Sequence, residues 1–422
     1  MSRSERLYYS DAFLKTFTAT VTDVRELART DGESIWQIAL DRTAFYPTSG
    51  GQPFDTGILR ATSRGGAALE VPVESVEEDE NGEVWHIVRK PLAAGTHVEA
   101  EIAWDRRFDH MQQHTGQHLL SAVFLDQIQA PTVSFHLGDT VSTIDLATAS
   151  IALHTLQRVE RLVNQIIAED RPVTSRDIPR AEAESMLAAG HLRKLPDRDG
   201  AIRIIEIADC DRNACGGTHV RSTGQIGGLL LRSVEKVSRG VRVEFVCGLR
   251  AVQTARADAT TLAQLTAALS AGPAEMHAAV ERLKAEAKTL TKERQRMREE
   301  LADYQASRLA VEVQIENGLR LVDRCWKDRD RDYIRLLASR LTSAVPGTAA
   351  ILCSEETTPA RIILARSLDL RFNCGTILRD ALAEHGLRGG GSPDLAQGDI
   401  PAELVPAFRA TLARIIRQQV TR

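Results

Sequence analysis

The first part of the chain consists of short runs in which apolar and polar residues alternate. Stretches rich in glycine, proline and serine separate these runs, which include FTATVTDV, SIWQIAL and EVWHIVRK. An alternation with a period of two is typical of strands that bury one face and expose the other. We therefore expect residues 1–92 to form a small β-barrel, with a β-sandwich as the alternative.

A mixture of helical and strand patterns follows, up to residue 248. Residues 105–126 and 155–170 carry apolar residues at the three- and four-residue spacing of a helix. Strand-like runs lie between and after them, among them TVSFHLG, AIRIIEIAD and VRVEFVCG. The pattern predicts an α+β domain over residues 93–248.

Residues 249–315 have a helical pattern almost throughout, with one break at Ser270-Ala271-Gly272-Pro273. This break predicts a helical hairpin. Apolar residues in the second arm fall on alternating steps of four and three, interrupted by Arg294, which is typical of an antiparallel coiled coil. Two uses of the hairpin stay open: a rigid spacer between domains, or a surface through which two copies form a homodimer. The C-terminal domain is the other surface through which a homodimer could form.

The last segment, residues 316–422, alternates strand-like and helical runs such as GTAAILCSE and YIRLLASRLTSA. This alternation predicts a small α/β domain, and the whole chain is therefore expected to be an α+β multidomain protein. The segment is mildly basic, whereas the net charge of the chain is −4. Any contact with nucleic acid must then come from local patches.

Composition narrows the class of protein. Of the 422 residues, 43% are hydrophobic and 26% are charged, as in globular proteins with ordinary cores. The chain contains neither an apolar signal segment nor the about 20 consecutive apolar residues of a membrane span. The six cysteines are scattered along the chain, which favours reduced thiols. We expect a soluble, cytoplasmic protein that has no membrane partner.

A candidate metal site is formed by two pairs of residues. His114 and His118 lie four residues apart in a helical segment, so their imidazoles share one face. Cys215-Gly-Gly-Thr-His219 adds a thiolate and a third imidazole, with glycines that let the backbone turn tightly. Three nitrogens and one sulfur suit Zn²⁺, whereas Mg²⁺ and Ca²⁺ require oxygen ligands. We predict one zinc ion bound by His114, His118, Cys215 and His219.

Two alternatives to this site stay open. Cys210 could replace Cys215, although Cys215 has the better spacing from His219 and lies in the glycine turn. A zinc ion with four protein ligands could also serve only to stabilise the fold, because a catalytic zinc usually keeps one open position.

The combination of HTGQH at 114–118 with CGGTH at 215–219 resembles the editing domain of alanyl-tRNA synthetase and its free-standing relatives. The similarity spans residues 10–250, through FYPTSGGQPFDTG, SFHLG, STIDL and GVRVEFVCG. RGGGSPDLAQGD at 388–399 resembles the glycine-rich signature of the DHHA1 domain, with QGD where many relatives have QGG. The two resemblances together indicate a free-standing editing protein of the long form.

This resemblance implies a zinc-dependent aminoacyl-tRNA hydrolase. Its substrate would be tRNA(Ala) mischarged with serine, and also with glycine, and its DHHA1 domain would bind the tRNA. No counterpart of the aminoacylation domain is found, so we expect editing without charging. Hydrolysis of the ester at the terminal ribose requires a positioned water and stabilisation of the developing oxyanion.

The loop Thr48-Ser49-Gly50-Gly51-Gln52-Pro53 faces the site in the family that the sequence resembles. Its glycines allow a substrate to approach the backbone closely. Thr48, Gly50, Gly51 and Gln52 are therefore our candidate catalytic residues. Thr48 is the candidate for recognising the serine hydroxyl, since a site that hydrogen-bonds a hydroxyl discriminates against alanine. A plain β-turn is the alternative interpretation of this loop.

Two further functions stay open. One is a non-catalytic tRNA-binding protein in which the zinc is structural. The other is a hydrolase of a different ester or phosphoester that acts through the glycine-rich C-terminal loop.

Overall fold

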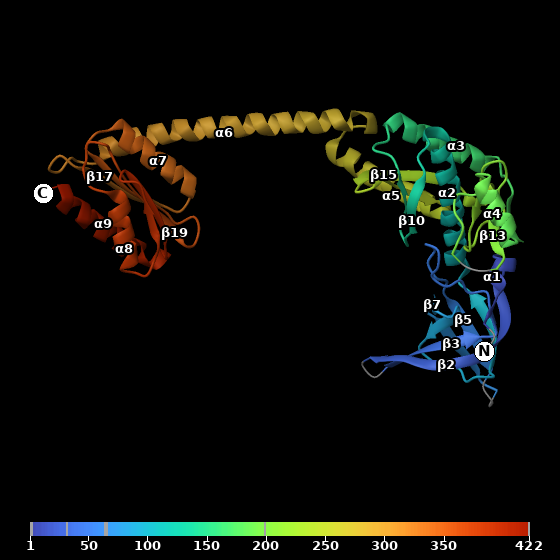
Figure 1. The fold of residues 1–422 in the computed structure, drawn as a ribbon. Coiled ribbons are helices and arrows are strands. Elements are labelled where there is room, and N and C mark those ends of the chain that lie inside the picture. The colour runs from blue at the N-terminus through green and yellow to red at the C-terminus, as the bar shows by residue number, and fades with distance from the viewer. Residues whose placement is uncertain (1–2, 31–32, 63–65, 198–199, 421–422) are drawn as a thin grey trace. The chain divides into compact units, whose positions relative to one another are not determined.

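The computed structural model describes residues 3–30, 33–62, 66–197 and 200–420. Its internal contacts divide the chain into two compact units, Met1–Gln264 and Leu265–Arg422, which Figure 1 follows from blue to red. Each unit is described by itself. The finer division into four domains stays a prediction.

The N-terminal part of the first unit is a seven-stranded antiparallel sheet. In spatial order its strands are β6 (Ala68–Val73), β5 (Gly57–Thr62), β9 (His97–Ile102), β2 (Thr16–Thr30), β3 (Glu33–Leu40), β8 (Val84–Val88) and β7 (Ser75–Glu78). Only Glu74 separates β6 from β7, so the two ends of this order come together and the sheet curls round on itself. Its apolar interior includes Ile38, Leu40, Phe45, Leu59 and Val71.

Short elements connect this sheet to the rest of the unit. The two-residue strands β1 (Glu5–Arg6) and β4 (Arg42–Thr43) pair in parallel, and the helix α1 (Leu7–Ser10) follows β1 directly. The chain segment between β4 and β5 contains the loop 48–53.

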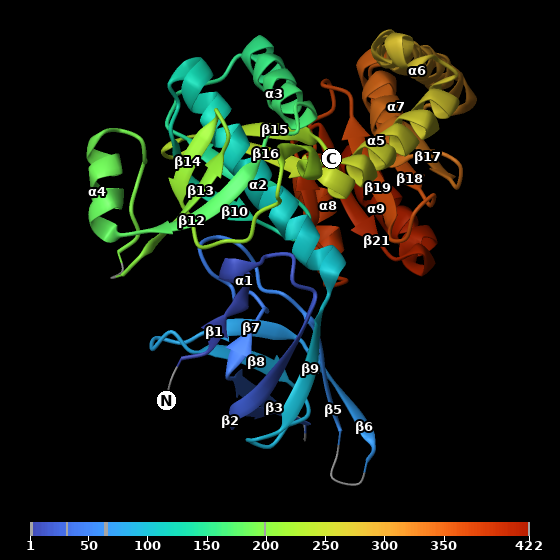
Figure 2. The same cartoon turned by 90° about the vertical axis from the view of Figure 1, so that its right-hand side faces the viewer.

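A long helix and two smaller sheets complete the unit (Figure 2). The helix α2 (Trp104–Ile128) packs against a sheet ordered β10 (Thr132–Leu137), β11 (Ser142–Leu146), β16 (Gly240–Cys247) and β15 (Leu229–Val237). A second sheet is ordered β12 (Val173–Ile178), β13 (Ile202–Ile207) and β14 (Asp211–Ala214). Helix α3 (Leu153–Ala168) packs on α2, and α4 (Arg180–Ala188) follows β12. Helices α2 and α3 are those that we predicted at 105–126 and 155–170.

Helix α2 is buried on almost every side although many of its residues are polar. His110, Gln113, His114, Thr115 and His118 are all at most 6% exposed. Removing such side chains from water costs free energy unless they find partners inside the protein. Apolar packing alone does not explain why so many polar side chains are buried on α2. These residues are therefore candidates for a metal-binding or catalytic role.

A buried ion pair joins α2 to the N-terminal sheet. Arg107 in the first turns of α2 and Asp55 before β5 are both fully buried. The Arg107 guanidinium donates to the Asp55 carboxylate and to the backbone carbonyls of Ala12 and Ala44, at 2.9 and 2.5 Å. The segment that carries the loop 48–53 is thereby held against the helix that carries two predicted zinc ligands.

The second unit is a three-layer α/β domain. Its sheet is ordered β17 (Arg320–Trp326), β18 (Thr348–Ser354), β19 (Ala360–Arg366), β21 (Leu395–Ile400) and β20 (Gly389–Gly391). β17 and β18 are parallel, and the other neighbours are antiparallel. One face is covered by α7 (Arg331–Ala344) and the end of α6 (Met276–Glu312), and the other by α8 (Cys374–Ala383) and α9 (Val405–Val420). The predicted C-terminal α/β domain is confirmed.

Two long helices flank the predicted break in the helical segment. They are α5 (Gly248–Leu269) and α6, and the short 3-10 turn Pro273–Glu275 leads into α6. Most of the apolar residues that we assigned to a coiled-coil seam on α6 are exposed, with Leu290 at 56% and Tyr304 at 67%, whereas Met276 and Val280 are half-buried. The coiled coil and the homodimer stay predictions. Among the helices of the described residues, none combines the length and the apolar content needed to cross a membrane.

Candidate metal centre

The four predicted ligands lie together although they come from two distant segments. His114 and His118 stand one turn apart on α2, and Cys215 and His219 belong to the loop after β14. One donor atom from each side chain lies within 4.8 Å of the donor atoms of the other three. The Sγ of Cys215 is 3.4 Å from Nε2 of His114 and 3.4 Å from Nε2 of His219. Cys210 is not part of this cluster.

Each histidine uses its Nδ1 atom for a hydrogen bond within the protein. The partners are Gln52 Oε1 at 2.9 Å for His114, Asp211 Oδ2 at 3.1 Å for His118 and Thr115 Oγ1 at 3.1 Å for His219. Such partners fix the tautomer and the orientation of a ligating imidazole. Every ring therefore directs Nε2 toward the cluster.

The protonation states of the cluster suit a metal ion. Burial alone would raise the pKa of the Cys215 thiol, but the imidazoles of His114 and His219 hold that pKa well below its usual range. Burial and the charge of His114 lower the pKa of His219 to about 3. Cys215 is thus a thiolate and His219 is neutral at pH 7, which are the forms that bind Zn²⁺.

His118 behaves differently from its neighbours. Burial opposes its positive charge, but hydrogen bonds with Asp211 and Cys215 outweigh this effect and raise the pKa of His118 to about 9. Without a metal, the His118 imidazolium is the cation that balances the thiolate. A metal ion takes over that balance and releases the proton of His118.

The loop between Cys215 and His219 requires glycine for close packing. A Cβ atom on Gly217 would lie 2.1 Å from Cε1 of His114, and 3.0 Å from Oε1 of Gln52. The amide of Gly217 donates to the Cys215 Sγ at 3.4 Å, which stabilises the thiolate. The buried Arg203 guanidinium donates to the carbonyls of Cys215 and Gly217 at 3.1 and 2.7 Å and holds the turn in place.

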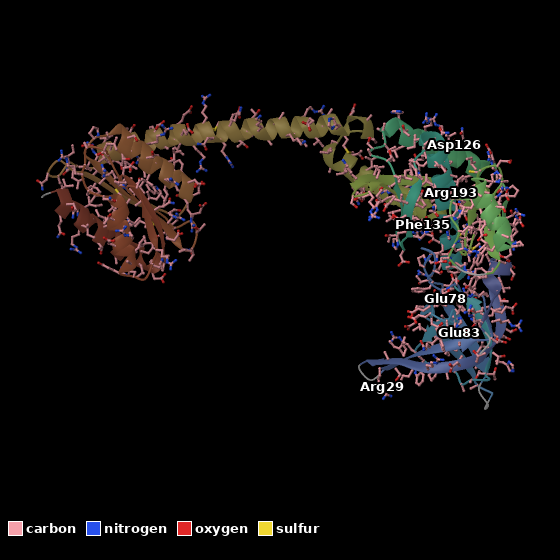
Figure 3. The ribbon with its side chains drawn as sticks, viewed as in Figure 1. Arg29, Glu78, Glu83, Asp126, Phe135 and Arg193 are labelled. Carbon is pink, nitrogen blue, oxygen red and sulfur yellow. The ribbon has the colours of Figure 1, made fainter. Side chains whose placement is uncertain are left out.

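The cluster opens on a cleft of about 730 Å³. Its walls combine basic, aromatic and glycine residues with three of the four candidate ligands, His114, His118 and Cys215. The other lining residues include Arg6, Tyr9, Tyr46, Ser49, Gly50, Gly51, Glu78, Phe135, Arg193, Lys194, Arg203 and Gly217. Phe135, Arg193 and Glu78 are labelled in Figure 3. A charged, extended substrate with an aromatic group would find both kinds of partner here.

The residues of the predicted catalytic loop have different surroundings. Gly50 and Gly51 line the cleft, and both have positive φ, 54° and 83°. Thr48 is exposed, its amide donates to the carbonyl of Val76 at 3.1 Å, and it is not among the residues that line the cleft. Gln52 is fully buried and contacts His114 rather than open space. The loop is both a tight turn and a wall of the cleft.

Sequence reasoning missed several residues of this site. Asp211, Arg203 and Thr115 hold the candidate ligands or their loop in place, and Arg193 pairs with Asp211 in the wall of the cleft. Thr115 lies inside the HTGQH motif, although the motif alone gave it no role, and no spacing in the sequence relates Asp211, Arg193 or Arg203 to the ligand motifs. Phe135 could have been identified from the sequence, because it belongs to the SFHLG stretch that carries part of the family resemblance.

Three family models match parts of this chain. The threonyl and alanyl tRNA synthetase second additional domain matches residues 202–243, which include Cys215 and His219. The model for class II (A) tRNA synthetases matches residues 1–106, and the DHHA1 domain matches residues 320–418.

Comparisons over most of the chain also find alanyl-tRNA editing proteins. The alanyl-tRNA editing protein AlaX-L of Pyrococcus horikoshii is 29% identical over 97% of this chain and 98% of its own length. The alanyl-tRNA editing protein Aarsd1 of Bos taurus is 31% identical over 71% of this chain and 67% of its own length. This chain belongs to the alanyl-tRNA editing protein family. The family resemblance inferred from the sequence is thereby confirmed.

Relatives of this editing family also include much longer proteins. The alanine–tRNA ligase of Pyrococcus abyssi is 32% identical over 95% of this chain, but the chain spans only 42% of the length of that ligase. The match to the ligase therefore extends over both units of this chain, including the two motifs that contain the candidate ligands and the DHHA1 domain.

Proposed function

We propose that this chain hydrolyses the ester bond between a wrong amino acid and tRNA(Ala). Serine is the main amino acid removed and glycine is a second. The observation that carries the proposal is a cluster of three imidazoles and one thiolate, of which His114, His118 and Cys215 line a cleft with basic and aromatic sides. The names of the editing relatives support the choice of tRNA, and such a role lies in the cytoplasm, where tRNA is charged.

One Zn²⁺ would be held by Nε2 of His114, His118 and His219 together with the Sγ of Cys215. When bound, the ion supplies a positive charge that can polarise a carbonyl or lower the pKa of a water molecule. The hydrogen bonds of the three Nδ1 atoms with Gln52, Asp211 and Thr115 keep the rings in the ligating orientation. The protein thus fixes the donor set before substrate arrives.

The cleft offers suitable contacts for the end of a tRNA. Arg6, Arg193 and Lys194 supply positive charge for phosphates, while Tyr9 and Phe135 supply rings on which an unpaired base can stack. Arg6 pairs with Glu78 at 2.6 Å, and Arg193 pairs with Asp211. A phosphate would compete with these carboxylates for the two guanidinium groups.

The loop 48–53 brings backbone close to the same cleft. Gly50 and Gly51 have no side chains to keep an aminoacyl group away from their amides. Thr48 is the residue that the family resemblance offers for recognition of the serine hydroxyl. Ser49, the next residue in the sequence, lines the cleft. These two hydroxyls are the candidates for separating serine from alanine.

The test is hydrolysis of seryl-, glycyl- and alanyl-tRNA(Ala), with and without removal of zinc by a chelator. We expect release of serine and glycine with alanine spared, loss of release after chelation, and recovery after zinc is added back. Retention of all three esters by a folded, zinc-loaded protein would contradict the proposal.

A non-catalytic tRNA-binding role with a structural zinc is the second candidate. It is favoured by the donor set itself, because four protein ligands complete a tetrahedral zinc and leave no open position. His118→Ala separates the two functions, with the exposed His154→Ala as its matched control. A His118→Ala protein that is folded and binds tRNA but no longer hydrolyses seryl-tRNA favours the hydrolase. Parent protein that binds tRNA without hydrolysing it favours the structural role.

A further inference from the structure

Two cysteines lie side by side at the edge of the sheet in the second unit. Cys325 on β17 is the register partner of Cys353 on β18. Because the two strands are parallel, register partners project from the same face of the sheet. Both residues contribute to the apolar layer under α8 and α9. The two thiols therefore share one environment, between an edge strand and its neighbour.

A carboxylate joins the two thiols. Glu355 follows β18 directly, and its amide donates to the carbonyl of Trp326 at 2.7 Å, which fixes it beside the end of β17. One oxygen of Glu355 and the two sulfur atoms all lie within 4.8 Å of one another. Cys353 is buried, whereas Cys325 and Glu355 are half-buried, so an ion from solvent can reach the group.

We propose that Cys325, Cys353 and Glu355 bind a thiophilic divalent cation, of which Zn²⁺ is the best suited. Two sulfurs and one carboxylate oxygen are ligands that Zn²⁺ prefers, and a water completes the tetrahedron. Two sulfurs that both ligate zinc lie about 3.8 Å apart, which the observed separation permits with small side-chain adjustments. The two thiol protons pass to the buffer when the ion binds.

The charge around the three ligands also suits a cation complex. Two thiolates and a carboxylate carry one negative charge more than a divalent cation neutralises. The guanidinium of Arg409 on α9 lies on the same face of the sheet, where its Nε bonds Asp323 at 2.7 Å, two residues before Cys325. The charge of Arg409, which it shares with Asp323, favours the thiolate forms of Cys325 and Cys353, whereas burial opposes them and raises the pKa of both thiols.

The bound ion would fasten the edge strand β17 to β18. Edge strands have an unpaired side and are the first part of a sheet to separate. β17 is also the strand that follows the long helix α6. The proposal is independent of the proposed function, because Cys325, Cys353 and Glu355 lie in the second unit and the candidate editing site lies in the first.

Counting zinc in the full-length protein tests the proposal. The reduced protein is stripped with a chelator, loaded with Zn²⁺, freed of excess by gel filtration and analysed for zinc by mass spectrometry. We expect two zinc ions for the parent, one for Cys325→Ser and one for Cys215→Ser. Cys374→Ser, which removes a buried thiol of the same unit outside the group, should keep two. One zinc in the parent and none in Cys215→Ser would overturn the proposal.

Cobalt provides a spectroscopic readout that does not depend on hydrolysis. In the Cys215→Ser protein loaded with Co²⁺, a thiolate-to-cobalt charge-transfer band should remain, and it should disappear when Cys325→Ser is added. Glu355→Gln, at a half-buried position, should weaken Co²⁺ binding without removing either thiolate. Absence of the band from folded Cys215→Ser protein at saturating Co²⁺ would overturn the proposal.

Discussion

Gln52 Oε1 accepts a hydrogen bond from Nδ1 of His114 at 2.9 Å, although the two residues are 62 positions apart in the sequence. The same oxygen accepts from the amide of Thr218 at 3.0 Å, and Gln52 Nε2 donates to the hydroxyl of Thr218 at 2.8 Å. One buried side chain therefore connects the loop 48–53, the histidine helix and the cysteine loop. Gln52 was one of four catalytic candidates from the sequence, and its contact with His114 leads us to propose that it positions a metal ligand.

Gln52→Ala should weaken zinc binding by about 10- to 100-fold, the usual effect of removing the partner of a ligating histidine. Competition with a chelating dye measures the affinity, and the exposed Gln418→Ala on α9 is the control. Should hydrolysis fall while the zinc affinity stays that of the parent, Gln52 would instead act directly on the substrate.

Gly217→Ala should disrupt the metal site without unfolding the chain. The added Cβ would lie 2.1 Å from the His114 ring, and overpacking of this kind costs about 1–3 kcal/mol. We expect zinc binding to weaken by roughly 10- to 100-fold. In the neighbouring Gly216→Ala the new Cβ would come no closer than 3.6 Å to Tyr9 Oη, so this variant should retain the parent affinity. Equal losses in both variants would refute the steric explanation.

Asp211→Asn should lower the pKa of His118 while the hydrogen bond survives. The negative charge and the hydrogen bond of Asp211 both help to raise the pKa of His118 to about 9. Zinc binding displaces that proton, so the affinity of the parent should fall about tenfold per pH unit below pH 9. In Asp211→Asn the same fall should begin at a lower pH, as zinc titrations between pH 6 and 9 would reveal. Identical pH profiles would show that Asp211 does not control this proton.

His86 on β8 should make the first unit less stable in mild acid. Burial lowers the pKa of His86 to about 4, whereas an unfolded histidine has a pKa of about 6.5. Between these values the unfolded chain binds one proton more, so the free energy of unfolding falls as the pH falls. The expected loss from pH 6.5 to pH 5 is about 1–2 kcal/mol. Urea unfolding of the parent and His86→Gln at both pH values measures it, with His154→Gln as control, and parallel behaviour of parent and His86→Gln would contradict it.

Thr48→Val and Ser49→Ala together test how serine is recognised. Loss of a hydrogen bond to the serine hydroxyl costs about 1–3 kcal/mol, so seryl-tRNA hydrolysis should fall roughly 10- to 100-fold in the variant that removes the partner. Our prediction names Thr48, and the release of glycine, which has no hydroxyl, should be unchanged. If Thr48→Val hydrolyses seryl-tRNA as fast as the parent and Ser49→Ala does not, the role belongs to Ser49.

The sequence predicted the four clustered donors because their positions follow from local geometry. A four-residue step on a helix, or a tight glycine turn, places two side chains together whatever surrounds them. The surrounding partners could not be predicted in this way. Asp211 lies 93 positions from His118 and Gln52 lies 62 positions from His114, and these pairs meet only after the sheets and α2 have packed.

The same limit applies to larger parts of the fold. The alternating runs predicted the strands of the N-terminal part. The order of the strands in the sheet could not be predicted from these runs, and neither could the connection of its two end strands, β6 and β7, by Glu74 alone. The helix at 105–126 was predicted from its spacing, but the burial of Arg107 depends on Asp55, in a segment that contains no helix signal.

The buried pair of Arg107 and Asp55 also limits how this chain could be recombined with others. Residues 93–248 on their own would lose Asp55, Ala12 and Ala44, the partners of the Arg107 guanidinium, and with them the contact that holds the loop 48–53 against α2. A graft of residues 93–248 onto another protein would lack these contacts. The smallest portion that an engineer could transplant intact therefore runs from the first strands through Cys247.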